Sequence, residues 1–143
     1  MAIWQMDISG LDEPALRYMR DPKKITPTID KMLKAGAAVM QEELRQEIKQ
    51  TFTKRPTGDL AKSIRPGRIK HTSTTATIEI KPVGNNKHKQ SRARIGTVLN
   101  YGRRAYKSGR GAIEATHWVE KVHARAEDKI RETMMEVWVG SGL

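Results

Sequence analysis

Four histidines have the clearest capacity for acid–base or metal chemistry in this sequence: His71, His88, His117 and His123. Glu114 and His117 have the Glu-x-x-His spacing that supplies half of a di-iron site in some helical bundles. The sequence holds one copy of that spacing, and it straddles the expected start of a helix. His117 and His123 would point in different directions on a helix. We therefore expect no metal site.

Nucleophilic and phosphate-binding patterns are also missing. No serine stands in a G-x-S-x-G elbow or is placed beside a histidine. The acids of the expected helices are interspersed with Lys or Arg, a pattern typical of solvated ion pairs. The segment KSGRG, residues 107–111, lacks the order G-x-x-x-x-G-K-[ST] of a phosphate loop. We expect a protein that is not an enzyme, with no catalytic residues and no cofactor.

The composition narrows the class of protein further. The chain has 143 residues, 37% of them apolar, and no cysteine. The absence of cysteine excludes disulfides, thiolate zinc sites and cysteine nucleophiles. No apolar run approaches the roughly 20 residues of a membrane helix, and the N-terminus has early acids where a secretory signal is apolar. We expect no membrane contact and synthesis in the cytoplasm.

The positive charge is concentrated in the middle of the chain. Residues 49–113 hold 16 Lys and Arg and two acids, a net charge of +14, whereas the remainder has 11 basic and 14 acidic residues, a net charge of −3. Such a block usually faces phosphates, solvent or an acidic protein surface.

Two helices frame the expected fold. Apolar residues recur at steps of three and four from Ile29 to Ile48, which predicts a helix over residues 26–52, roughly 38 Å long. Thr26 is its expected N-cap, and Gly36 is either a weak point or a site of close packing. A second helix is expected to begin at a Thr116 cap and to end near Trp138. Its apolar positions are Val119, Val122, Ala126, Ile130, Met134 and Val137.

Strands and loops are expected between these helices. Residues 74–83 alternate apolar and polar side chains, which predicts a half-buried strand, and residues 68–73 are its expected hairpin partner. Residues 84–94 and 103–113 read as basic loops. Residues 95–102 fit either a third strand or one helical turn. The predicted class is α+β: a long N-terminal helix, a short helix, a small antiparallel β-sheet, and a C-terminal helix packed on the sheet.

Residues 1–25 are predicted to be an N-terminal arm, followed by a single domain over residues 26–143. Terminal arms are poorly ordered unless something holds them. Trp4 either contacts a neighbouring subunit or packs back on its own domain, and the sequence leaves both open.

The segment KRPTGDLAKSI, residues 54–64, is expected to be an elbow between the long helix and the hairpin. Thr57 or Gly58 caps a short helix, and Asp59 lies near its positive end. Leu60 and Ile64 share a face. Pro66 and Gly67 end this helix. The turn is expected to need a positive φ at Gly58.

This order of elements resembles the tail-completion, or neck, proteins of tailed bacteriophages and prophages. Members typically show P-x-x-T-G-x-L-x-x-S-I after a long helix, then strands, an E-[YF]-G-T segment, and a P-F segment that opens the last helix. The resemblance covers residues 28–137. The residues that fit the first motif are Thr57, Gly58, Leu60, Ser63 and Ile64, and Tyr101 and Gly102 fit the second. Asn100, Arg103 and the pair His117 and Trp118 depart from the pattern.

The resemblance implies a structural virion protein that joins head to tail. It implies a homo-oligomeric ring, commonly sixfold, between the head-closure or adaptor layer and the tail terminator or tail tube. Double-stranded DNA would pass through the ring without specific contacts, and the protein would reside in the virion neck after assembly in the host cytoplasm. Tail-terminator and head-closure roles remain alternatives.

A mechanism of assembly follows from the basic loops. We expect the loops and the N-terminal arm to be extended and to become ordered only against neighbouring subunits or layers. The expected contact residues are Trp4, Lys87, Lys89, Arg92, Arg94, Tyr101, Arg103, Arg104, Lys107 and Arg110. The alternative is a basic nucleic-acid-binding domain, since residues 80–113 hold nine Lys and Arg, no acid and two tyrosines.

Overall fold

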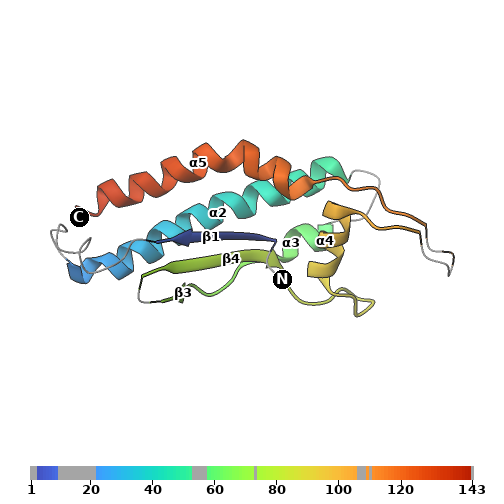
Figure 1. Ribbon diagram of the computed structural model, residues 1–143, viewed down its shortest axis with the longest axis horizontal. Coiled ribbons are helices and arrows are strands. Elements are labelled where there is room, and N and C mark those ends of the chain that lie inside the picture. The colour runs from blue at the N-terminus through green and yellow to red at the C-terminus, as the bar shows by residue number, and fades with distance from the viewer. Residues whose placement is uncertain are drawn as a thin grey trace.

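A computed structural model describes residues 3–9, 22–52, 58–72, 74–105, 109 and 111–142. Two long antiparallel helices lie beside a small antiparallel sheet, and a short helix stands at one end of the elongated molecule (Figure 1). The elements are β1 (Trp4–Ile8), the 3-10 helix η1 (Pro22–Lys24), α2 (Ile25–Thr51), α3 (Gly58–Ser63), β2 (Ile64–Pro66), β3 (Lys70–His71), β4 (Ala76–Pro82), α4 (Arg92–Tyr101) and α5 (Trp118–Gly140). The predicted α+β class is confirmed.

The sheet is built around β4. This strand pairs antiparallel with β1 on one side and with β2 and β3 on the other. Trp4 lies opposite Ile80 and Met6 opposite Ile78, so these side chains share the face that packs on the helices. The predicted strand and its hairpin partner are both confirmed, although the partner is reduced to the two residues of β3.

The N-terminal segment differs from the predicted arm. Residues 4–8 form a strand of the sheet, and Trp4 is buried against the core of its own chain, with 9% of its surface exposed. Its indole Nε1–H donates to His123 Nδ1 over 3.3 Å, which links β1 to α5. Of the two interpretations of Trp4, packing on its own domain is therefore the one that the structure supports.

Helix α2 has the predicted apolar stripe but not the predicted start. Leu33, Ala37, Met40, Leu44 and Ile48 are all fully buried. The helix begins at Ile25 with Lys24 at the N-cap position, and no side chain caps it. Thr26 is wrong as the N-cap because η1 runs directly into α2, which leaves Thr26 inside the first turn.

Helix α5 is also capped differently from the prediction. It begins at Trp118, and the preceding residue, His117, is left-handed with φ of 50°. The Thr116 hydroxyl does not cap α5, because it donates to the carbonyl of Leu99 over 2.6 Å. The side-chain oxygen of Asn100 accepts from the Val119 N–H over 3.0 Å instead. The cap of α5 therefore comes from α4, at a distance of 19 residues along the chain.

Helices α3 and α4 also differ in their bounds from the predicted elements. Helix α3 is confirmed, but it ends at Ser63, and Ile64 begins β2. Residues 95–101 are helical, as one of the two alternatives held, and Gly102 follows the helix. α4 already begins at Arg92, inside the predicted loop. Ser91 explains the early start, because its hydroxyl accepts from the Arg94 N–H over 3.3 Å and caps the helix.

The two long helices are held together by packing and by charge. α5 lies along α2 over most of its length and meets the sheet at the β1 edge. Arg125 on α5 contacts Glu47 over 2.9 Å and Glu43 over 3.2 Å on α2. Burial opposes ionisation of Glu47, but hydrogen bonds from Arg125 and Thr51 outweigh it, and the pKa of Glu47 is lowered.

Gly36 is a site of close packing between these helices. A Cβ there would lie 2.9 Å from Met6 Cε, 3.1 Å from Met134 Sδ and 3.3 Å from Ile130 Cγ2. The methionine ends can shift for one methyl group, but a larger side chain has no space. β1, α2 and α5 therefore converge where α2 lacks a side chain.

We predict that Gly36→Leu lowers the free energy of unfolding by about 1–3 kcal/mol, because the added side chain overpacks the helix interface. Gly36→Ala should cost little, since alanine favours the helix by roughly 1 kcal/mol over glycine. Urea unfolding measures both. Ala38→Leu, on the exposed side of the same helix, is the matched control. Equal stabilities of Gly36→Leu and Ala38→Leu would contradict the packing account.

We predict that Glu47→Gln removes about 1 kcal/mol of stability at neutral pH. Because the folded pKa of Glu47 lies below its ordinary value of 4.5, its contribution is present above that value and disappears as the pH falls through the folded pKa. The difference between wild type and variant should therefore shrink in acid. Glu42→Gln is the control, since Glu42 is exposed on the same helix and accepts from Gln46. A difference that is independent of pH would refute the assignment.

Candidate assembly surface

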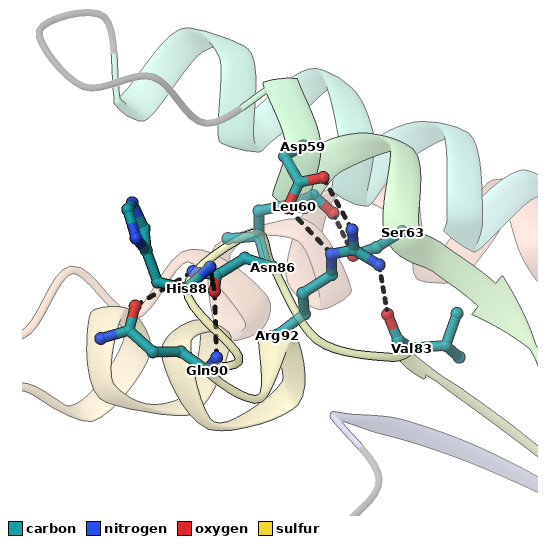
Figure 2. A network of polar contacts seen from close by, with 8 residues as sticks. All are labelled: Asp59, Leu60, Ser63, Val83, Asn86, His88, Gln90 and Arg92. Atoms are coloured by element: carbon teal, nitrogen blue, oxygen red, sulfur yellow. Dashed lines mark hydrogen bonds and ion pairs between the residues drawn. The ribbon is translucent and has the colours of Figure 1, made fainter.

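Arg92 joins three segments at the α4 end of the molecule. Its guanidinium forms two hydrogen bonds with the Asp59 carboxylate on α3, both over 2.8 Å, and a third with the carbonyl of Val83 after β4 over 3.1 Å (Figure 2). Hydrogen bonds from Arg92 hold the pKa of Asp59 below its ordinary value. Arg92 was expected to contact a neighbouring subunit or layer. In the structure its hydrogen bonds to Asp59 fasten α4 to the elbow.

The first basic loop is compact rather than extended. The side-chain oxygen of Asn86 accepts from the backbone N–H groups of His88 and Gln90 over 2.9 and 3.0 Å (Figure 2). The Asn86 N–H also donates to the Gln90 carbonyl, and the Arg92 N–H to the Gly84 carbonyl. The expectation of an extended loop is wrong here, because an asparagine inside the loop satisfies its backbone. The side chains of Lys87 and Lys89 remain exposed.

The second basic segment is anchored at its base. Arg103 and Ile113 exchange backbone hydrogen bonds over 2.9 and 3.0 Å. Gly102 precedes this bridge with φ of 77°, and a Cβ there would lie 2.6 Å from the Ile113 carbonyl oxygen. Arg104 is exposed. Lys107 and Arg110, two of the expected contact residues, lie outside the described residues.

A groove of about 670 Å³ opens between these two segments and α4. Ile95, Val98, Leu99 and Ile113 form its apolar part. Its polar part consists of Asn85, Lys89, Gln90, Ser91, Arg94 and Arg103. Among the described residues, no acid lines this groove, so three cations stand around an apolar floor. Of the expected contact residues, the structure brings together Lys89, Arg94 and Arg103 in this groove.

Tyr101 stands beside the groove rather than in it. Its side chain is 63% exposed and meets the His117 ring edge-on at a centroid distance of 6.4 Å. Trp4, by contrast, is unavailable for a contact because it is buried.

The elbow residues are packed into the fold, but Gly58 does not have the expected conformation. Leu60, Ser63 and Ile64 are buried, and the Ser63 hydroxyl donates to the Leu60 carbonyl over 2.7 Å. Gly58 does not have a positive φ, and a Cβ there would meet nothing within 4 Å. The expected need for glycine at Gly58 is therefore wrong, since it begins a right-handed helix. Thr57 lies outside the described residues.

Asn100 is a structural residue that sequence reasoning missed. It is buried, and besides capping α5 its amide donates to Glu120 Oε1 over 3.1 Å. An amide residue in the mainly apolar segment 95–101 is the signal that could have identified it, because a buried amide needs partners.

The histidines do not form a common site. His71 lies 3.1 Å from Asp30, and His117 lies 3.8 Å from Glu120. No group of three or more potential metal ligands occurs within the described ranges. No helix in the same part of the chain combines the length and apolar character needed to cross a bilayer.

Comparisons with protein-family models, curated proteins and solved structures find no significant match to this chain.

We predict that Gly102→Ala destabilises the protein by about 1–3 kcal/mol, because its backbone conformation is almost restricted to glycine and the new Cβ would clash with the Ile113 carbonyl. Gly58→Ala is the control and should be tolerated. Thermal unfolding of both variants measures the difference. If Gly58→Ala were the more damaging change, the account of both glycines would be wrong.

Proposed function

We propose that this chain is a structural subunit of the neck of a tailed bacteriophage or prophage, where copies form a ring around the DNA channel and help to join head and tail. The observation that carries the proposal is the order of elements: α2, then α3 with Leu60 and Ser63, then the β3–β4 hairpin, then Tyr101 and Gly102 at the end of α4, and then α5. This is the order that the resemblance to neck proteins implies.

The exposed charges support an assembly role. Four exposed cations belong to α4 and the segments on either side of it, at one end of the elongated molecule: Lys87, Lys89, Arg94 and Arg104. Such a surface is attracted to acidic protein or to DNA and lowers the barrier to encounter with either. A subunit inside a neck ring has neighbours of both kinds.

We predict that the triple variant Lys87→Glu, Lys89→Glu and Arg94→Glu folds normally but fails to support head–tail joining, because all three side chains are exposed. The test is complementation of a phage that lacks this gene, with electron microscopy of the particles and circular dichroism of the purified variant. The matched control is Lys31→Glu, Lys34→Glu and Arg68→Glu, which reverses three exposed cations elsewhere. Joined particles in the complete absence of the chain would refute the neck role.

A basic nucleic-acid-binding domain is the second candidate, and the cations of the α4 end favour it. The two functions differ in a simple measurement. Binding of isolated subunits to double-stranded DNA that weakens steeply with salt, together with absence from purified virions, would favour this candidate over the neck role.

A further inference from the structure

The two ends of the molecule carry complementary surfaces. The first surface is the groove beside α4, whose floor is apolar and whose cations are Lys89, Arg94 and Arg103. Lys89 and Arg94 form no ion pair with any described residue. Lys89 and Arg94 therefore present positive charge that no carboxylate of the described chain neutralises.

The second surface lies on the last turns of α5. Four exposed residues share one helix face there, at positions i, i+3, i+4 and i+7: Glu132, Met135, Glu136 and Val139. Met135 is 58% exposed and Val139 is 71% exposed, which makes them two of the three exposed large apolar residues of the described chain. The face is acidic and apolar, whereas the groove is basic and apolar.

The acids of this face differ from several other acids on the long helices. Glu43 and Glu47 are paired with Arg125, and Glu127 is paired with Arg131. Glu132 and Glu136 have neither an ion pair nor a side-chain hydrogen bond to any described residue. Asp128, one turn earlier, is likewise without an ion pair, and Glu132 and Glu136 lie beside the exposed methionine and valine.

The two surfaces cannot meet within one chain. The start of α5 is fixed to α4, because Asn100 accepts from the Val119 N–H over 3.0 Å and Trp118 donates to the Gly96 carbonyl over 3.2 Å. α5 then runs away from α4 for 23 residues, which is roughly 34 Å. Its last turns lie at the opposite end of the molecule from α4, whose residues line the groove (Figure 1).

We propose that the last turns of α5 dock into the α4 groove of a second copy of this chain. Met135 and Val139 pack on Ile95 and Val98, while Glu132 and Glu136 lie against Lys89 and Arg94. The contact is head-to-tail, so each copy uses its helix end on one neighbour and its groove on the other. A head-to-tail contact produces a ring where the rotation closes and a filament where it does not. This contact would join neighbouring subunits of the proposed neck ring, and its biological role rests on that proposed function.

The absence of native cysteine allows a direct test by cross-linking. We expect Met135→Cys in one chain and Val98→Cys in another to form a disulfide on mixing under mild oxidation, since a disulfide needs Cα atoms less than about 7 Å apart. A chain that carries both changes should give a ladder of cross-linked multimers on a denaturing gel, because the two sites of one molecule cannot reach one another. Met135→Cys mixed with Ala38→Cys is the control pair and should not cross-link, since Ala38 is exposed on α2 outside the groove.

Charge reversal provides a second, independent test. Arg94→Glu and Glu136→Arg should each weaken self-association by roughly tenfold, and the chain with both changes should regain it, because the attraction is restored with opposite signs. Sedimentation velocity at low and high salt measures this. Glu42→Arg is the control for a reversed exposed acid on another helix.

The outcomes separate this contact from the neck role. The protein could form an oligomer in which the Cys pair does not cross-link and neither charge reversal changes the assembly. That result would overturn this contact but would not contradict the neck role. A linked pair with charge-swap rescue, in a protein that is absent from virions, would support the contact and overturn the neck role. The contact would also be overturned if the chain stayed monomeric and formed no cross-link at any concentration. It would be overturned as well if Arg94→Glu weakened DNA binding but left self-association unchanged.

Discussion

The junction between α4 and α5 sets the geometry on which the rest of the structure depends. Trp118 is fully buried, and its indole N–H is satisfied by the Gly96 carbonyl. Asn100 is buried beside it and both caps α5 and contacts Glu120. A buried amide left without these partners would cost about 1–3 kcal/mol, so the junction has one strongly preferred arrangement. It fixes the direction of α5 and therefore the distance between the groove and the last turns of that helix.

The sequence predicted the elements in which apolar residues recur with helical spacing over a long stretch or alternate strictly with polar ones. The stripe from Leu33 to Ile48 identified α2, and the alternation of Ala76, Ile78 and Ile80 identified β4, because burial of one face imposes these periods. It did not identify β1. Residues 4–8 become a strand only through pairing with β4, which lies about 70 residues away in the chain.

The local rules for helix caps failed where tertiary contacts supplied the partner. Thr116 has the right residue type for a cap, but its hydroxyl reaches α4, and an amide from α4 takes over the cap. Gly58 resembles a turn glycine, whereas the backbone that needs glycine is at Gly102. The groove depends on segments 85–91, 94–103 and 113 meeting in space, which no spacing in the sequence reveals.

Ion pairs hold the elements of each subunit together, whereas several exposed charges at the two ends of the molecule have no such partners. Arg125 of α5 pairs with Glu43 and Glu47 of α2, Lys129 also pairs with Glu43, and Arg92 pairs with Asp59. These pairs hold the subunit together. At the α4 end, Lys89 and Arg94 form no ion pair with a described residue, and the same holds for Glu132 and Glu136 on the last turns of α5. Such a molecule repels a copy placed groove to groove and attracts one placed end to end, because like charges then lie far apart. The proposed contact would therefore be directional, and a closed ring of such contacts would leave no groove and no helix end exposed.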